Sequence, residues 1–199
     1  MKLRYSQTSP YVRKVVITAI ETGLAGRIEH VATDPWSPET DLPTHNPLGR
    51  VPALVTDDGA VLYDSPVICD YLDSLHDGPR LIPAEGAARW TTLRRQALAD
   101  GLLDASVAVR VETVMRPADR RWDAWIDRQR GAILRGLDVL EAEMPATGFT
   151  LGEITIVCAL DYLDFRKPVE NWREGRPRLA AWHGALSKRP SVASTRPSD

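Results

Sequence analysis

The first part of the chain is organised around the run Asn46-Pro47-Leu48-Gly49-Arg50-Val51-Pro52-Ala53-Leu54. The apolar residues that follow Pro52 predict a strand that reaches Thr56. A second apolar run, residues 60–63, lies beyond Asp57-Asp58-Gly59, and an Asp-Gly pair is typical of the turn in an antiparallel hairpin. The run and its neighbour therefore predict two antiparallel strands.

On the N-terminal side of this hairpin, the pattern predicts a strand, a helix and a strand. Residues 2–5 alternate in hydropathy, and the apolar positions of residues 12–20 recur at helical spacing up to Gly23, a C-cap candidate. Residues 27–32 predict the next strand, which should be parallel to the first through a right-handed crossover. Beyond the hairpin, residues 67–75 predict one more helix. This order predicts a thioredoxin-like α/β domain over residues 1–77, followed by a linker at 78–84.

Prolines divide the rest of the chain into long intervals. Nine of the fifteen prolines lie at or before Pro83. An interior proline costs a helix about 3 kcal/mol, so helices are expected within residues 84–116, 118–144, 146–167 and 178–189. Apolar residues in these intervals recur at spacings of three, four and seven. Residues 85–199 are therefore expected to form an all-helical domain.

The composition argues against several classes of protein. The 199 residues carry 25 Lys and Arg against 27 Asp and Glu, a net charge of −2, so nucleic acid is not expected as a partner. No apolar run approaches the roughly 20 residues of a membrane span, and none follows Met1 as a signal peptide requires. The two distant cysteines favour reduced thiols over a disulfide. We expect a cytoplasmic protein that has no membrane partner.

Two Ser-Pro pairs, Ser9-Pro10 and Ser65-Pro66, each precede an apolar helical stripe. Serine is favoured at the N-cap and proline at the first helical position, so both pairs predict helix starts. Both helices follow strands, and a helix N-terminus at the carboxyl edge of a sheet presents free N–H groups and partial positive charge. The pattern predicts two adjacent anion sites, with simple capping as the competing interpretation.

Together these motifs resemble the cytosolic glutathione transferase family, and the bacterial serine-type members most closely. The resemblance rests on Ser9-Pro10-Tyr11, on the run around Val51-Pro52, on Tyr63-Asp64-Ser65-Pro66-Val67-Ile68 and on Leu151-Gly152-Glu153-Ile154-Thr155. It spans essentially the whole chain. It implies a homodimer that takes glutathione as a co-substrate, with no cofactor and no metal.

The resemblance also implies roles for individual residues. Val51 precedes a cis-proline and pairs its N–H and C=O with the cysteinyl backbone of glutathione. Ser65 and its helix N-terminus take the γ-glutamyl carboxylate, while Asp64 takes the ammonium. The hydroxyl of Ser9 faces the sulfur.

For three further assignments, more than one interpretation of the residues stays open. Arg50 matches the residue for the glycyl carboxylate, with a solvated loop charge as the competing interpretation. Ser6 and Thr8 are alternative partners for the sulfur. Asp100, one turn before Asp104, is assigned to the glutathione ammonium of the partner subunit, and a solvated or interface face is the competing interpretation.

Other residues depart from the family pattern. Thr155 is followed three residues later by Cys158 where the family often has Asp, so only half of a capping box is expected. Cys69 and Cys158 are expected in the core. No cysteine precedes Cys69, which disfavours disulfide exchange at the Ser9 position. The four histidines have no metal-ligand spacing.

These observations predict a glutathione transferase that transfers the thiolate to a small, soft electrophile bound between the domains, in a detoxification role. The rival is a non-catalytic glutathione-binding or protein-interaction module with the same fold. The sequence does not distinguish conjugation from peroxidase, dehalogenase or isomerase chemistry.

Overall fold

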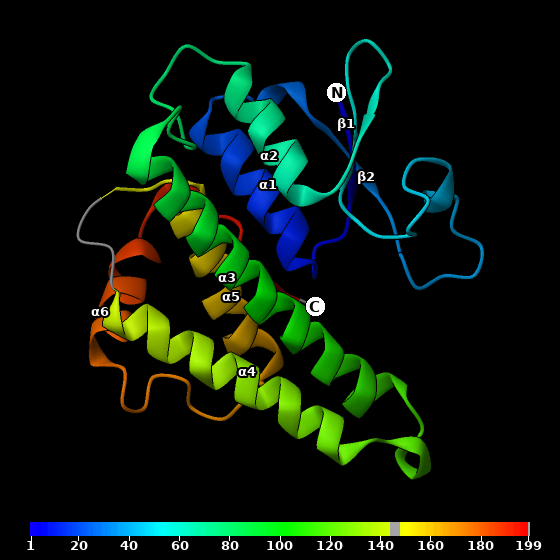
Figure 1. The fold of residues 1–199 in the computed structure, drawn as a ribbon. Helices are drawn as coiled ribbons and strands as arrows, with labels where there is room; N and C mark the ends of the chain where they lie inside the picture. Colours follow the sequence, from blue (N-terminus) through cyan, green and yellow to red (C-terminus); the bar gives the residue numbers. More distant parts are fainter. Residues whose placement is uncertain (144–147, 199) are drawn as a thin grey trace.

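The computed structural model describes residues 1–143 and 148–198. One lobe carries β1 (Lys2–Tyr5), α1 (Pro10–Glu21), β2 (Glu29–Ala32), β3 (Ala53–Val55), β4 (Val61–Leu62) and α2 (Ser65–Ser74). The rest carries α3 (Gly86–Arg110), α4 (Asp123–Ala142), α5 (Leu151–Arg166), α6 (Pro177–Leu186) and α7 (Pro190–Ala193). Short turns of 3-10 helix lie at Ala25–Arg27, Leu42–Thr44 and Ala118–Arg120, and a π-helical turn, Val111–Met115, follows α3. The predicted fold, thioredoxin-like and then all-helical, is confirmed (Figure 1).

The four strands form one sheet in the order β2-β1-β3-β4. β1 and β2 are parallel, which confirms the predicted β-α-β unit. β1 pairs antiparallel with β3, where Arg4 lies opposite Ala53, and β3 pairs antiparallel with β4, where Leu54 lies opposite Leu62. The end of β1, the start of β3 and the end of β4 therefore lie at one edge of the sheet.

Both Ser-Pro helices begin at this edge, but their caps differ. Ser9 is the N-cap of α1 and Pro10 its first residue, as predicted. At α2 the N-cap is Asp64, and Ser65 is already helical. The prediction that Ser65 is the cap is wrong, because the Asp64 C=O accepts the first helical bond from the Ile68 N–H at 3.0 Å. The N–H of Ser65 is consequently one of the first-turn donors without an intrahelical acceptor.

Helix α1 is shared by both domains. On one side its apolar residues pack with Leu3, Leu54 and Leu72 in a core of the sheet and α2. On the other side Ile17 packs with Val157 of α5. Because α1 lies between these layers, its polar faces are also covered, and Arg13 and Lys14 are 5% and 0% exposed.

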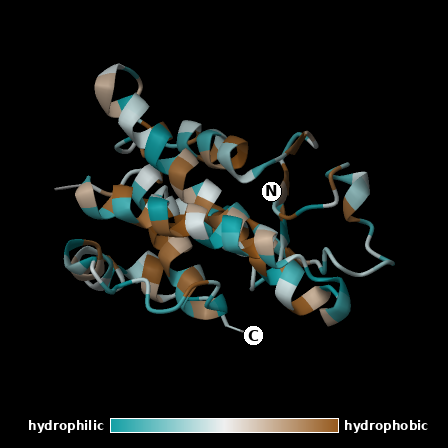
Figure 2. Cartoon of the chain, turned by 60° about the horizontal axis from the view of Figure 1, so that its bottom comes forward, coloured by the Kyte–Doolittle hydropathy of each residue, from teal (hydrophilic) through white to brown (hydrophobic). Residues whose placement is uncertain are grey.

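Helix α5 forms the centre of the helical domain. Residues 151–160 are all buried, and α5 packs along α3, which packs along α4. Figure 2 shows the apolar segments gathered toward the middle of the helices and the hydrophilic ones outside. Among the described residues, no helix has both the length and the hydrophobicity needed to cross a membrane.

The start of α5 corrects one expectation. Its N-cap is Thr150, whose hydroxyl accepts from the Gly152 N–H at 3.3 Å. Glu153 completes the capping box by accepting from the Thr150 N–H at 2.9 Å. The expected half box of Thr155 and Cys158 is wrong, because both residues lie inside α5, beyond the turn whose N–H groups need capping.

One buried carboxylate anchors the connection between α2 and α3. Asp73 is 2% exposed and accepts from the N–H groups of Leu81 and Ile82 at 2.7 and 3.0 Å. The C=O of Leu81 accepts in turn from the Leu151 N–H, at 2.9 Å, where α5 begins. The predicted linker, 78–84, lies within this connection, and the domain bounds at 77 and 85 stay a prediction.

Candidate functional site

Three predicted site residues follow one edge of the sheet. Ser9 begins α1 after β1, Val51 lies just before β3, and Ser65 begins α2 after β4. The three strands are neighbours, and since adjacent strands lie about 4.8 Å apart, β1 and β4 are roughly 10 Å apart. An extended tripeptide spans about the same distance. The edge is therefore a suitable length for a ligand of that size.

The hydroxyl of Ser9 acts as an acceptor and still has a proton to donate. Its oxygen accepts from the Val12 N–H at 3.3 Å, and a hydroxyl carries one O–H donor beside its lone pairs. Ser9 is half-buried, at the end of the helix. The hydroxyls of Ser6 and Thr8, in the same loop, are also half-buried and bond to no other described residue, so both alternatives stay open.

The peptide bond between Val51 and Pro52 is cis, as the resemblance implies. Val51 is half-buried and lies outside the ladder, which begins at Ala53. None of the backbone hydrogen bonds in the described loops uses its N–H or C=O. These two groups suit an extended ligand backbone, which would pair with them as an added strand does. Arg50 is exposed, and its side chain has no partner among the described residues, so its two interpretations stay open.

The two side chains at the start of α2 bond to no other described residue. Asp64, after a cis Tyr63–Asp64 bond, is exposed and does not cap the helix, whereas Ser65 is 2% exposed. A carboxylate placed at Ser65 would meet free N–H groups and the positive end of the helix dipole. An ammonium beside it would meet Asp64. The pair fits the end of a ligand that carries both charges.

Asp100 forms an ion pair within its own chain. Its two carboxylate oxygens accept from Lys14 Nζ at 2.7 and 2.8 Å, and its side chain is 17% exposed. Burial raises the pKa of Asp100 above its usual range, although the Lys14 charge opposes this. The solvated alternative is wrong for Asp100, because this side chain of α3 packs against α1 and pairs with the buried Lys14, and the interface alternative stays open. Its role toward the partner subunit stays a prediction.

A second contact between α1 and α3 lies one turn nearer to Ser9. The hydroxyl of Tyr11 donates to the carboxylate of Asp104. Burial, together with this hydrogen bond, raises the pKa of Tyr11 far above its usual range. Tyr11 therefore stays protonated and holds α1 against α3.

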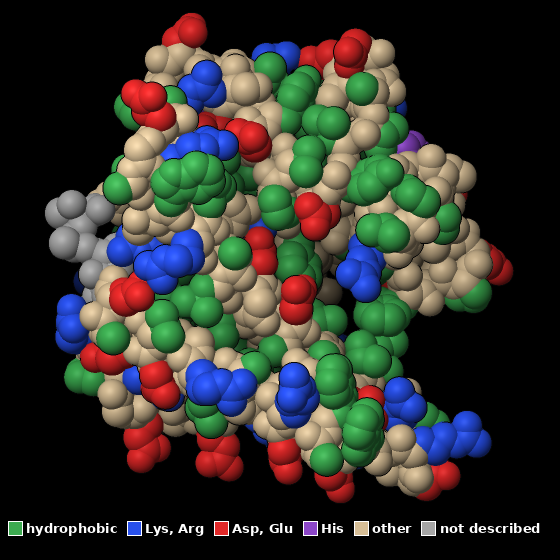
Figure 3. All heavy atoms as spheres, viewed as in Figure 1, with side chains coloured by type: hydrophobic (Ala, Val, Ile, Leu, Met, Phe, Trp, Pro, Cys, Tyr) green, Lys and Arg blue, Asp and Glu red, His purple; other side chains and the backbone are tan. Residues whose placement is uncertain are grey.

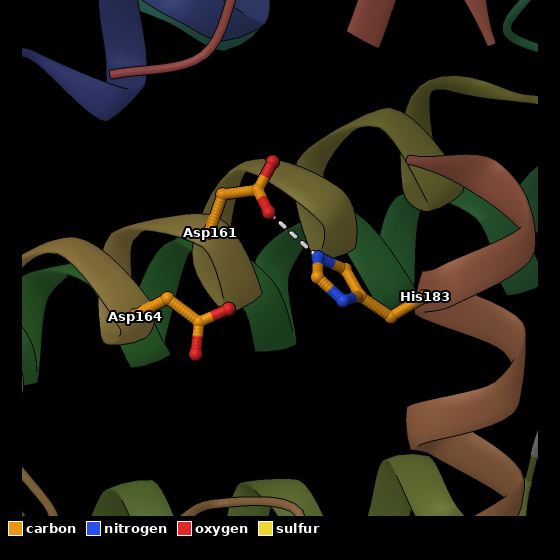
Figure 4. A group of neighbouring side chains, drawn as sticks. All are labelled: Asp161, Asp164 and His183. Atoms are coloured by element: carbon orange, nitrogen blue, oxygen red, sulfur yellow. Dashed lines mark hydrogen bonds and ion pairs between the residues drawn. The ribbon is translucent and has the colours of Figure 1, made fainter. Parts of the chain in front are cut away.

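A buried polar group also joins α1 to α5 and α6. Asp161 hydrogen-bonds to His183 Nε2 at 2.6 Å and pairs with Arg13 Nη2 at 2.7 Å. Burial opposes the charged form of Asp161, but the His183 bond and the Arg13 charge hold its pKa below the usual range. Figure 4 shows Asp161, Asp164 and His183 close together. Both carboxylates already neutralise an arginine, since Asp164 accepts from Arg173 at 2.6 Å, so we assign the group to packing rather than to a metal.

The two cysteines are core residues, as predicted. Cys69 and Cys158 are free thiols, 0% and 1% exposed. Burial raises the pKa of Cys69 to about 11 and that of Cys158 to about 12. Both stay protonated at neutral pH, so neither thiol is a nucleophile.

A cavity of about 340 Å³ lies on the opposite face of α1 from Lys14. Its walls come from β1, β2, α1 and residues 194–196 of the C-terminal tail. Ser6 and Gln7 line it, and Gln7 donates to the hydroxyl of Ser198, which ties the tail to the loop before α1. The cavity is therefore separate from the edge that carries Val51 and Ser65.

The sequence pattern did not single out Tyr11, Arg13 or Lys14 as contacts between the domains. The apolar stripe of α1 marks only the face that packs on the sheet. The partners of Lys14 and Tyr11 are 86 and 93 residues away, so no local spacing signals them. A sequence signal was present only in the charged and aromatic side chains that interrupt an otherwise apolar helix.

The chain is similar to known proteins over its whole length. Residues 8–75 match the family model described as "Glutathione S-transferase, N-terminal domain", and residues 123–185 match "Glutathione S-transferase, C-terminal domain". The Escherichia coli K12 protein named "Uncharacterized GST-like protein YibF" is 36% identical over 202 residues, which cover 99% of this chain and 98% of that protein. A crystal structure of a glutathione transferase family member from Pseudomonas fluorescens Pf-5, with bound glutathione, is 48% identical, with a TM-score of 0.94 over 100% of this chain and 99% of that one. A second structure from that organism, with bound S-(propanoic acid)-glutathione, is 48% identical, with a TM-score of 0.92 over 100% of both chains.

Proposed function

The chain belongs to the glutathione S-transferase family, and from this we propose that it binds glutathione along the β1-β3-β4 edge and transfers the glutathionyl group, through its thiolate sulfur, to a soft electrophile. One observation carries the proposal. The backbone groups of Val51, which take part in none of the hydrogen bonds of the described loops, and the two helix starts, at Ser9 and Ser65, lie on three neighbouring strands at the same edge.

In this proposal each part of glutathione meets a group of matching chemistry. The γ-glutamyl carboxylate binds at Ser65 and the α2 N-terminus, and the ammonium binds Asp64, since charge-assisted hydrogen bonds are the stronger kind. The cysteinyl backbone pairs with Val51, and Arg50 meets the glycyl carboxylate. In the proposed homodimer, Asp100 of the other subunit adds a carboxylate for the ammonium, which requires it to act beyond its pair with Lys14.

In this proposal the Ser9 hydroxyl donates a hydrogen bond to the sulfur and so stabilises the thiolate. A free thiol with a pKa near 8.5 is about 3% ionised at pH 7, and a pKa lower by about two units makes it roughly 75% ionised. Because nucleophilicity falls with basicity at a slope of about 0.4–0.5, nearly tenfold of the roughly 25-fold gain is lost. The net gain is about threefold, so positioning of the thiolate against the electrophile must supply most of the acceleration.

The solved relatives support the glutathione part of the proposal. At 48% identity over the whole chain, the Pseudomonas fluorescens family member holds glutathione in one structure and S-(propanoic acid)-glutathione in the other. We extend binding of glutathione, and of glutathione carrying a group on its sulfur, to this chain. We further propose that it works as a cytoplasmic homodimer, takes its small second substrate between the domains and serves in detoxification.

The rival function is a module that binds glutathione, or another protein, without catalysis. Both functions use the same edge, so binding alone does not separate them. A panel of halonitroarenes, isothiocyanates, epoxides, enones and organic peroxides does. We expect one class to turn over well above the others. Uniform background rates in a protein that still binds glutathione would favour the rival.

Calorimetric titration with glutathione tests the binding site itself. Asp64→Ala and Ser65→Ala should each weaken binding at least several-fold, because each removes the partner of one charged end. Asp70→Asn is the matched control, since Asp70 is exposed on the same helix and away from its start. Wild-type protein that gives no heat with glutathione would contradict the proposal.

A further inference from the structure

The helices cover only part of the sheet face that packs on α1. Leu3 of β1 lies opposite His30 of β2, so these two side chains point to the same face. Leu3 packs with apolar residues of α1 and is 0% exposed, whereas His30 is exposed. Because β2 is the edge strand, the helical cover ends between these two strands.

The cavity of about 340 Å³ lies where this cover ends. Its floor comes from β1 and β2, one side comes from α1 through Val16 and Ile20, and residues 194–196 of the C-terminal tail complete the wall. Sites for small ligands have volumes of roughly 300–1,000 Å³, so the cavity is large enough for one small molecule. It is separate from the β1-β3-β4 edge, so it is a different site from the one proposed for glutathione.

The cavity wall carries positive charge and no negative charge. Of the described residues that line it, Arg13 and Arg196 are cations and none is an Asp or a Glu. Asp161 balances the charge of Arg13, so Arg196 supplies the free positive charge. Figure 3 shows acidic and basic side chains interspersed over one face of the molecule, and the lining of the cavity differs from that mixture. A lining of one sign attracts the opposite charge, so the cavity favours an anionic ligand.

Both arginines have hydrogen-bonding capacity left. Arg196 is exposed, and its one described hydrogen bond runs from Nη2 to the Ser187 C=O at 3.5 Å. Arg13 is 5% exposed and donates from Nε to the Thr195 hydroxyl at 3.3 Å and from Nη2 to the Val192 C=O at 3.2 Å. Its buried Nη1 has no hydrogen-bond partner among the described residues. Because a buried donor without an acceptor is costly, an anionic oxygen at this wall is favourable.

The floor of the cavity carries an aromatic pair. The rings of Tyr5 and His30 are stacked, with their centroids 4.5 Å apart and their planes 7° from parallel. Both residues line the cavity, and the α1 side contributes the aliphatic Val16 and Ile20. A planar ring stacks on aromatic faces and packs well against aliphatic side chains. The lining therefore suits a ligand that carries a planar ring as well as an anionic group.

We propose that this cavity is a second ligand site and that it takes a nucleoside monophosphate. The base packs against the rings of Tyr5 and His30. The phosphate binds Arg196 and the free N–H group of Arg13. A phosphate offers more acceptor oxygens than a carboxylate does, and the hydroxyl of Ser194, next to Arg196 in the lining, adds a further donor. This site goes beyond the proposed transferase function and does not depend on it.

Calorimetric titration with adenosine monophosphate tests the site. Adenosine lacks the phosphate and ribose 5-phosphate lacks the base, so each of them removes one of the two contacts. Wild type should bind adenosine monophosphate about tenfold more tightly, or better, than either of them. Saturating glutathione should leave this binding unchanged, because the cavity lies apart from the β1-β3-β4 edge.

Substitutions assign the phosphate contact and the base contact separately. Arg196→Gln should lose most of the preference over adenosine. His30→Ala should lose most of the preference over ribose 5-phosphate, and His30→Phe, which keeps a ring beside Tyr5, should retain it. Both residues are exposed, so these variants should fold. Arg178→Gln is the matched control, since Arg178 is an exposed arginine of α6 that does not line the cavity.

Four results would contradict the inference. Wild type that gives no heat with adenosine monophosphate, or that binds adenosine or ribose 5-phosphate equally well, would overturn it. Displacement of the nucleotide by glutathione would place the nucleotide at the β1-β3-β4 edge and overturn it too. The planar carboxylate 2-naphthoate should bind more weakly, and equal binding would overturn the choice of a phosphate. A full preference that survives both Arg196→Gln and His30→Ala would overturn the assignment of the contacts.

Discussion

Lys14 is completely buried, and its ammonium lies 2.7 and 2.8 Å from the two carboxylate oxygens of Asp100. This ion pair joins α1, the helix that begins at Ser9, to α3 of the helical domain. Together with the hydrogen bond from Tyr11 to Asp104, it fixes how the two domains meet at the site.

The first prediction concerns the stability of this pair. Lys14→Met leaves the Asp100 carboxylate buried without its counter-charge, so the free energy of unfolding should fall by about 3–5 kcal/mol. The double variant Lys14→Met/Asp100→Leu replaces both charges with apolar groups and should recover most of the loss. Urea denaturation measures both. A single variant that costs less than about 1 kcal/mol would show that the pair is not desolvated.

The second prediction concerns the link from α1 to α5. Asp161→Asn removes the charge that neutralises the buried Arg13 guanidinium and should lower the free energy of unfolding by about 3 kcal/mol or more. Asp164→Asn is the matched control on the same helix. Its side chain and that of Arg173 are 38% and 40% exposed, so about 1 kcal/mol is expected. Equal losses in the two variants would contradict the special role of Asp161.

The lowered pKa of Asp161 predicts that the free energy of unfolding depends on pH. The pKa of Asp161 in the folded protein lies below its ordinary value of 3.8, because His183 and Arg13 overcome the cost of burial. The unfolded chain therefore takes up the proton first as the pH falls, and the stabilisation is present above about pH 4 and is lost through the folded pKa. Unfolding curves recorded between pH 7 and pH 3 should show wild type approaching Asp161→Asn in stability. A constant gap between them would be the contrary result.

The third prediction concerns Ser9. Ser9→Ala should raise the apparent pKa of the bound glutathione thiol, measured as thiolate absorbance against pH, with little change in affinity. The turnover rate should fall by about tenfold or less, because lowering the pKa of the thiol raises its reactivity at neutral pH by only about threefold. Loss of the cap on the Val12 N–H should also cost about 1 kcal/mol of stability. Ser6→Ala and Thr8→Ala are the controls, and a pKa that moves only in one of them would reassign the sulfur contact.

The fourth prediction tests the homodimer. Gly101 lies on the exposed face of α3, next to Ala97, and a Cβ added there meets no atom within 4 Å. Gly101→Glu should leave the fold of one subunit intact and place a charge on α3, the helix that the proposed role of Asp100 requires to lie at the subunit contact. Sedimentation should give twice the mass of 22.1 kDa for wild type and a smaller mass for the variant. A wild-type monomer would overturn the homodimer, and with it the role of Asp100 toward the partner subunit.

The sequence predicted the elements whose signals are local. The Asp-Gly turn located the hairpin, and the Ser9-Pro10 pair located the start of α1, because turn and cap preferences act over a few residues. The capping box of α5 was misplaced by five residues. Thr150 and Thr155 both suit a cap, and only the position of the first helical hydrogen bond decides between them.

The charged contacts between the domains could not be predicted from the sequence. Arg13 and Lys14 sit on the polar side of a helix whose apolar stripe is complete without them. They are buried only because α3 and α5 cover that side, and such long-range packing leaves no periodic trace. For the same reason Asp100 was expected on a solvated or interface face.

The most direct test is a crystal structure of the protein with glutathione bound. We expect the γ-glutamyl carboxylate at the Ser65 end of α2, the cysteinyl backbone paired with Val51, and the sulfur within hydrogen-bonding distance of the Ser9 hydroxyl. Glutathione bound away from the β1-β3-β4 edge, or a sulfur that contacts Ser6 or Thr8 and not Ser9, would contradict the proposed site.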